Sequence, residues 1–345
     1  MKRRPGEISP FLILVFFFFL ITPVRGQAQD GDSSWWPKPL SSRNQFPILH
    51  LFLGFEPESA TSLKPGRTSL NFDLSLSNII KISSAGFELD ADRLVLDFEW
   101  WRFLAQFEVG LGGGFQAGLS LPVFYRSGGF LDSFISGFHE TFGIPNSVRR
   151  STPNGLFRYE LFLDGGRVLG PIQRGMAIGD AVLSLKKIWS FSGTGFGLRA
   201  ALKVPTGPWR EAAGSGASDL GFGLILGGAG RTLGYTLNAN YCLLGRPMIP
   251  GLRARDYFSL MAGLHLRLGR RLALNAQADY FSRFVDSRIP ILNQRAGQIA
   301  LGLRWRAAER LMFEFRLSED LASTSPDFTF GLRLEFSKGD TIPCP

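Results

Sequence analysis

The chain has few of the residues that build disulfide frameworks, metal centres and catalytic triads. Its 345 residues include two cysteines, Cys242 and Cys344, and three histidines, His50, His139 and His265. Two cysteines are too few for a disulfide framework, and no Cys/His spacing typical of a zinc site occurs in the sequence. The sequence therefore predicts no metal and no cofactor.

Long hydrophobic runs are scarce as well. After the first 26 residues no apolar run approaches the 18 or more residues of a membrane-spanning helix, which argues against a helical inner-membrane protein. The one marked run, residues 11–21, follows basic residues at positions 2–4 and precedes a small-residue cleavage site. This order predicts a signal peptide over residues 1–26, with cleavage after Ala28 as an alternative. An uncleaved anchor is the competing interpretation, although the run is shorter than the roughly 20 residues that a spanning helix needs.

A strong charge excess is missing too. The leader carries four basic residues and one acidic residue, so its removal lowers the formal net charge from +9 to +6. The remaining basic residues are spread among the alternating segments and form no basic tract with interleaved aromatics. We therefore expect no nucleic-acid partner.

What the chain does have is regular alternation of apolar and polar residues. In the last such segment, 327–336, aromatic or aliphatic side chains alternate with polar, charged or glycine residues. This period of two is that of a β-strand with two different faces. The segments with this pattern are 66–80, 93–109, 114–126, 178–190, 194–205, 217–229, 233–245, 255–268, 271–284, 295–307, 309–320 and 326–337. An even number of strands, joined by alternating short and long connections, is typical of an outer-membrane barrel with both termini in the periplasm.

The sequence thus predicts an all-β fold, a transmembrane antiparallel β-barrel of about 12 strands over residues 66–337. The expected location is the outer membrane of a Gram-negative bacterium. Residues 27–65 are predicted to be a periplasmic N-terminal segment, or a segment tucked into the barrel mouth. The apolar cluster 48–53 favours docking, because disordered tails lack such runs. Residues 338–345 are predicted to be a C-terminal tail.

The polarity of the two strand faces distinguishes two kinds of barrel. Soluble ligand carriers place apolar side chains inside, whereas membrane barrels place them outside and keep a polar lumen. Buried without water, the charges of the polar face would be costly in a soluble barrel. The residues expected to line the lumen are Asp73, Asp97, Arg199, Lys203, His265, Arg267, Asp279, Arg304, Arg306, Glu314, Arg316, Arg333 and Glu335. These charges either set a solute preference or pair across the lumen and fill it.

Aromatic residues near the ends of the strands suit the interfacial girdles of a membrane barrel. Ordinary strand aromatics are the alternative. The candidates are Trp100, Trp189, Tyr235, Tyr241, Tyr257 and Trp305.

The connection 127–177 is too long for a plain loop. Apolar residues recur in it at spacings of three and four, which predicts a short amphipathic helix that ends near Gly143. We expect this helix to lie across the outer mouth as a plug or lid, or at the lipid surface. Its predicted residues are Phe130, Phe134, Phe138, His139 and Phe142.

Several stretches resemble an uncharacterised family of bacterial outer-membrane proteins, the domain-of-unknown-function family 3187. They are residues 43–47, the strand end 121–124 with Gly128 and Gly129, and above all 131–145 with Arg149. The resemblance covers most of the mature chain and implies an outer-membrane barrel. It implies no established activity.

The most direct functional prediction is a channel or porin-like protein for small solutes, and the excess of lumen arginine favours anionic ones. An enzyme is not expected, but the alternative is a lipid hydrolase or acyltransferase that uses His139 with Ser136 and Glu140, since Ser136 and His139 share a helix face. His139→Ala would abolish such an activity and leave conductance nearly unchanged. A structural or adhesion barrel that binds a partner through loop 127–177 is a further alternative. Expected partners are outer-membrane lipid, the barrel assembly machinery through the C-terminal strand, and the solute.

Overall fold

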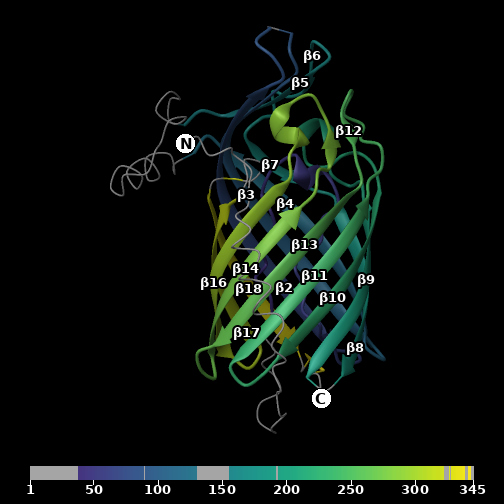
Figure 1. Ribbon diagram of the computed structural model, residues 1–345, viewed down its shortest axis with the longest axis vertical. Helices are drawn as coiled ribbons and strands as arrows, with labels where there is room; N and C mark the ends of the chain where they lie inside the picture. Colours follow the sequence, from purple (N-terminus) through teal and green to yellow (C-terminus); the bar gives the residue numbers. More distant parts are fainter. Residues whose placement is uncertain are drawn as a thin grey trace, which may run out of the picture.

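A closed barrel of twelve antiparallel strands makes up most of the described chain (Figure 1). The computed structural model describes residues 38–88, 90–129, 155–191, 193–321, 326, 328–338 and 341–342. The barrel strands are β2 (Thr68–Ser84), β3 (Arg93–Gly112), β4 (Phe115–Ser127), β8 (Ala181–Phe191), β9 (Thr194–Val204), β10 (Asp219–Ala229), β11 (Leu233–Leu243), β13 (Tyr257–Arg267), β14 (Leu272–Phe281), β16 (Ala296–Ala308), β17 (Leu311–Asp320) and β18 (Phe328–Lys338). Within the described part of the chain, no helix is long and apolar enough to cross a membrane.

The predicted strand pattern is confirmed. All twelve expected segments are strands, and their observed ends differ from the predicted ends by at most four residues, which is a typical error for boundaries read from sequence. The prediction succeeds because the period-two pattern is local to each strand and persists around the whole barrel wall.

The wall closes between its first and last strands. Strand β18 pairs with β2 over the full length of β18, from Phe328 opposite Asn78 to Lys338 opposite Thr68. Every other barrel strand pairs with its neighbour in the sequence, and β3 pairs with β4. Closure leaves no free edge strand along the barrel, so the backbone groups of the wall are satisfied within it.

The two ends of the barrel differ in the length of their connections. One end, here called the turn end, carries short connections such as the β3–β4 turn, where Gly112, Gly113 and Gly114 have positive φ values of 95°, 56° and 81°. The other, the loop end, carries the long connections and several short elements (Figure 1). These elements are β5 (Arg158–Leu163), β6 (Gly166–Leu169), β7 (Gly175–Ile178), η3 (Trp209–Glu211), β12 (Arg253–Ala254), β15 (Val285–Asp286) and η4 (Pro290–Asn293).

Strands β5 and β7 extend the wall beyond the loop end, since β5 pairs with β3 and β7 pairs with β4. Residues 158–163 of the long connection are therefore part of the wall, as strand β5. The helix expected within 127–177, and its residues from Phe130 to Phe142, lie outside the described residues.

The outer face of the barrel is apolar. Leucine and phenylalanine side chains on alternate positions point outward, with Leu301, Phe315 and Leu317 each about half exposed at 56%, 46% and 49%. Their strand neighbours Arg304 and Arg316 are buried in the interior. This polarity is that of a barrel that meets lipid outside and water or polar groups inside.

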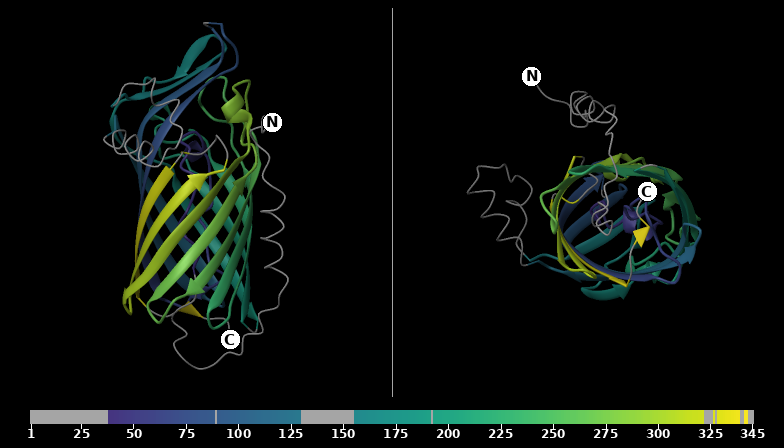
Figure 2. Two further views of the ribbon diagram at one scale, coloured as in Figure 1. Left: turned by 60° about the vertical axis from the view of Figure 1, so that its left-hand side comes forward. Right: turned by 90° about the horizontal axis from the view of Figure 1, so that it is seen from below.

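The N-terminal segment runs inside the barrel. We call residues 38–63 the plug; Figure 2 shows this segment within the ring of strands when the barrel is viewed along its length. It includes a one-turn helix, η1 (Leu49–Leu51), and a two-residue strand, β1 (Ser62–Leu63), which pairs with β19 (Thr341–Ile342). The described part of the predicted periplasmic segment thus lies in the lumen, because its apolar residues find burial there and would not find it in the periplasm.

The plug rises from the turn end, reverses at the loop end and returns. The main-chain oxygen of Lys38 accepts a hydrogen bond from Asn275 near the start of β14. At the reversal, η1 lies beneath the loop-end elements, and Leu63 then returns to the start of β4, where its N–H donates to Gln116 at 3.0 Å. The plug therefore spans the length of the lumen twice before β2 begins.

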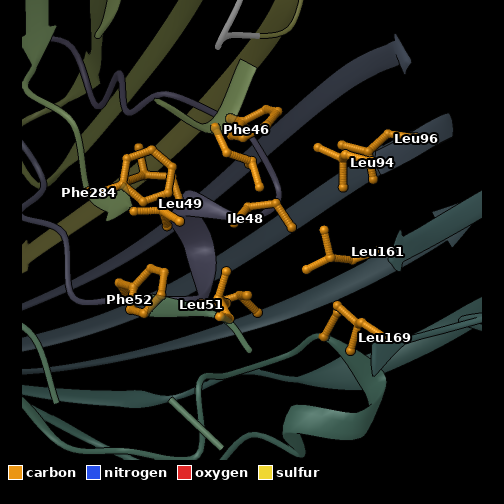
Figure 3. Close-up of a cluster of buried hydrophobic side chains, with 14 of the residues drawn as sticks. Phe46, Ile48, Leu49, Leu51, Phe52, Leu94, Leu96, Leu161, Leu169 and Phe284 are labelled. Carbon is orange, nitrogen blue, oxygen red and sulfur yellow. The ribbon is translucent and has the colours of Figure 1, made fainter. Parts of the chain in front are cut away.

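The top of the plug is held by a hydrophobic core at the loop end (Figure 3). Residues 46–53 of the plug pack there against β3, β5, β6 and the loop that carries Phe284. The upper half of β3 is apolar at successive positions, because one of its faces lines this core. Members of this core, all buried, include Phe46, Ile48, Leu49, Leu51, Phe52, Leu94, Leu96, Trp100, Phe124, Leu161, Leu169, Tyr257 and Phe284.

Two of the six expected girdle aromatics belong to this core. Trp100 and Tyr257 are 0% and 1% exposed, and the Tyr257 hydroxyl donates to the main-chain oxygen of Leu53 at 2.6 Å. The girdle prediction is wrong for these two, because their strand faces meet the plug and not the lipid. Trp189, Tyr241 and Trp305 are exposed on the outside.

Trp100 should be among the most costly aromatic residues to truncate. Its ring stacks on Phe124 with a centroid separation of 4.6 Å and contacts His50 of the plug at 5.8 Å. Trp100→Ala is expected to lower the free energy of unfolding by about 3–5 kcal/mol, measured by urea unfolding in lipid vesicles. Trp305→Ala, on the outer face, is the matched control and should cost clearly less. An equal loss of unfolding free energy in the two variants would show that the core around the plug contributes no more to stability than the outer face does.

Candidate functional site

The lumen carries most of the charged residues predicted for it. Arg267, Arg306 and Arg333 are half-buried, and Asp97 is buried but lies on the opposite face of β3 from Arg102, since side chains alternate along a strand. The other predicted residues are buried on the inner face: Asp73, Arg199, Lys203, His265, Asp279, Arg304, Glu314, Arg316 and Glu335.

One group of these charges joins wall strands to each other. The Arg316 guanidinium donates to both oxygens of Asp73 at 2.6 and 2.8 Å, and also to Ser75 at 2.7 Å and Glu314 at 3.3 Å. These bonds link β17 to β2 across β18. Asp73 is fully buried, so its charge depends on this bidentate contact.

A second group joins the rising arm of the plug to the wall. Lys38 forms an ion pair with Glu335, whose other oxygen accepts from Arg304 at 3.1 Å. The Ser41 N–H donates to Glu314 at 2.8 Å, and the Ser42 hydroxyl donates to Asp279 at 3.2 Å. The plug therefore supplies further partners to carboxylates that also accept hydrogen bonds within the wall, Glu314 from Arg316 and Asp279 from Gln298.

A third group holds the returning arm. Glu58 pairs with Lys186 at 2.8 Å and with Arg199 at 3.0 Å, and Glu56 pairs with Arg102. All three nitrogens of the Arg199 guanidinium have partners, since Asn238 and Asn240 accept the remaining bonds. This arm is attached by polar contacts to β3, β8, β9 and β11.

Near the loop end, Lys203 joins the plug to two connecting loops. Its ammonium contacts Asp180 at 2.7 Å and Asp219 at 3.1 Å, and it donates to the main-chain oxygen of Leu51 and to Ser215. Asp219 also accepts from the Leu53 N–H at 2.8 Å. One lysine and its two carboxylates thus bind the end of η1 and the start of the returning arm to the wall.

Small residues in the wall make room for the plug. A Cβ on Gly221 would lie 2.6 Å from the ring of Phe55, and one on Gly302 would lie 2.6 Å from Leu40. Both glycines occupy lumen-facing strand positions. A glycine inside a strand often marks a close approach of another chain segment, so these positions were the signal for a filled lumen that the strand pattern alone does not show.

Two narrow spaces remain beside the plug. Measured as the space open to the centre of a water-sized sphere, the cavity nearer the loop end is about 60 Å³ and the one nearer the turn end about 50 Å³. Glu58 and Glu108 line both. Since one water needs roughly 10–15 Å³ on this measure, each cavity holds only a few waters.

Two further sequence predictions concern histidines. His265 faces the lumen, where its Nε2 lies 3.0 Å from the Thr236 hydroxyl, as one polar wall residue among many. Ser136, His139 and Glu140 lie outside the described residues, so their predicted role in a lipid hydrolase stays a prediction. Sequence reasoning missed Arg43, Glu56 and Arg102, because no strand pattern shows that a segment before the barrel enters it.

Comparison with models of known protein families gives one match. A family model described as "Protein of unknown function (DUF3187)" matches residues 24–337. The chain belongs to this family. None of the curated proteins matches it.

Three solved structures that are similar to this chain were found. The COG4313 outer membrane channel from Pseudomonas putida F1 is 11% identical, with 82% of this chain and 100% of that chain covered and a TM-score of 0.56. The NanC porin is 7% identical, with 77% and 98% covered and a TM-score of 0.44. The Pseudomonas putida toluene transporter TodX is 11% identical, with 88% and 100% covered and a TM-score of 0.39. At these identities, the likeness to the first of them shows the fold.

Proposed function

We propose that this member of the DUF3187 family is a channel for small solutes in the outer membrane of a Gram-negative bacterium, with the plug as the element that sets its free cross-section. The observation that carries the proposal is a closed barrel with charged residues on its inner wall, filled by a segment whose two arms are attached to that wall through polar contacts. A wall designed only for mechanical support gains nothing from buried charge, which is costly to desolvate. A wall that lines a solute path has a use for such charges, because charged side chains on the inner wall set ion and solute preference.

The apolar outer face supports the membrane location. In bacterial outer-membrane barrels the short connections face the periplasm and the long ones face outward. The turn end, where the plug enters and β18 ends, is then periplasmic. A solute would enter from the loop end, pass between the plug and strands β3, β4 and β8, and leave beside Glu58 and Glu108.

Planar-bilayer recording of the refolded mature protein tests the proposal. We expect discrete current steps of low conductance, because only narrow spaces flank the plug. Arg333→Gln should shift the reversal potential in a salt gradient toward cation preference, since Arg333 lines the turn-end cavity. Arg310→Gln, at an exposed turn position outside the lumen, is the matched control and should leave the reversal potential unchanged.

Silence of both the intact protein and a variant without the plug would contradict the channel. Folding would be confirmed in each case by heat-modifiable gel mobility. That outcome would favour a structural barrel.

A further inference from the structure

The cavity nearer the loop end is lined on one side by the plug and on the other by the wall. Arg43, His50 and Glu56 line it from the plug, and Arg102 and Gln106 line it from β3. Arg43 and Arg102 are 9% and 1% exposed, so both guanidinium groups are removed from bulk water.

Among the residues that the structure describes, several polar atoms of these five side chains have no hydrogen-bond partner. The donors without one are the Nε of Arg43 and the Nε and one terminal nitrogen of Arg102. The acceptors without one are one oxygen of Glu56 and the amide oxygen of Gln106, and His50 Nε2 is also without a partner. Buried polar groups are normally satisfied, so a cluster of open donors and open acceptors around one cavity indicates an occupant that offers both.

The charge at this cavity favours an anion. Arg102 pairs with Glu56, and Arg43 lies 3.9 Å from the same carboxylate, so two guanidinium groups share one negative charge. Burial, reinforced by these two guanidinium groups, holds the pKa of His50 well below its usual range, so the ring is neutral.

The remaining charges that line the cavity have partners elsewhere. Lys203 pairs with two carboxylates, Asp180 and Asp219, and Glu58 pairs with two cations, Lys186 and Arg199, so the two groups together are neutral. Glu108, towards the turn end, accepts hydrogen bonds from the amides of Gln116 and Asn71.

The arrangement of Arg43 is set by the backbone of the plug. Its terminal nitrogen donates to the main-chain oxygens of Leu49 and Phe52 at 3.4 and 3.2 Å. A Cβ on Gly54 would collide with this guanidinium. The guanidinium is therefore held against the plug. One terminal nitrogen donates to the plug backbone, the other faces Glu56, and Nε has no hydrogen-bond partner among the described residues.

We propose that this cavity is a binding site for a small hydroxycarboxylate on the route of the channel. The carboxylate would take the open donors of Arg43 and Arg102, which are suited to planar oxygen pairs. The hydroxyl would donate to Glu56 or Gln106, whose open oxygens would repel a carboxylate that has no such donor. The inference rests on the proposed function for its biological meaning, but binding can be measured without conductance.

The test is calorimetric titration of the refolded full-length mature protein in detergent with sodium glycolate, the smallest hydroxycarboxylate. We expect saturable binding, with acetate and the neutral glycolamide each weaker by about tenfold or more, because each lacks one of the two required groups. Arg102→Gln should weaken glycolate binding by about tenfold or more. Arg310→Gln, at an exposed turn position away from this cavity, is the control and should bind glycolate as the wild type does.

Arg43→Gln provides a second variant from the plug side in case Arg102→Gln does not fold. Absence of saturable glycolate binding overturns the site, as does undiminished binding by a folded Arg102 or Arg43 variant. Equal affinity for glycolate and glycolamide also overturns it. Current steps in the bilayer experiment would keep the channel proposal intact in each of these cases, whereas binding without current steps would retain the site and contradict the channel.

Discussion

Deletion of residues 38–61 should raise the single-channel conductance at least about fivefold. The plug passes through the lumen twice, and its removal leaves a charged, water-accessible pore. The deletion joins the preceding residues to Ser62, so the short pairing between β1 and β19 is kept. Planar-bilayer recording of the intact and deleted proteins under the same salt conditions gives the ratio. Equal conductance of the two folded proteins would show that the plug does not set the pore.

A reversible cross-link provides the control for this deletion. A Cβ on Gly227 would lie 3.2 Å from the Cβ of Ala60, a few tenths of an ångström shorter than the roughly 3.5–4.5 Å of a disulfide, so a small shift of the plug allows the bond. In a Cys344→Ser background, Ala60→Cys with Gly227→Cys should fix the returning arm to β10. In mild urea we expect the intact protein to gain conductance as the polar contacts of the plug weaken, and the oxidised double variant to gain it only after reduction. If the oxidised double variant gains conductance in mild urea as the intact protein does, the current does not pass where the plug lies.

Arg316→Met should be the most destabilising single substitution in the wall. It leaves Asp73, which is fully buried, and Glu314 without their main cationic partner, and such an uncompensated buried charge costs about 3–5 kcal/mol. The measurement is urea unfolding in lipid vesicles, followed by tryptophan fluorescence. Arg310→Met, at an exposed turn position, is the control and should change stability by less than about 0.5 kcal/mol.

A double variant separates the charge effect from lost packing. Asp73→Leu together with Arg316→Met removes both charges, and replacement of a buried pair by apolar groups is often close to neutral. We expect the double variant to recover more than half of the stability lost by Arg316→Met, with Glu314 still close to Arg304. No recovery would mean that Arg316 acts through its packing or its bond to Ser75 and not through Asp73.

The barrel wall could be predicted from the sequence because its signal is local. Each strand shows its two faces within about ten residues, and the polar positions of one face identify the lumen, so that residues such as Arg304 and Glu335 were placed without knowledge of their partners. The number of strands followed from the same repeat. The partners themselves did not follow, because Arg316 meets Asp73 only after the last strands close onto the first.

The sequence by itself thus determined a twelve-stranded barrel, its inner and outer faces and its short and long ends. Only the tertiary structure decided what fills it. Residues 48–53 showed that the N-terminal segment needs burial. The sequence pattern does not distinguish burial against a periplasmic partner, burial at the barrel mouth and burial along the lumen. The choice depends on contacts between the plug and wall segments more than 140 residues away in the sequence, such as Leu53 with Asp219 and Glu56 with Arg199. Such contacts form because wall charges and plug backbone groups satisfy one another only when the barrel is closed around them.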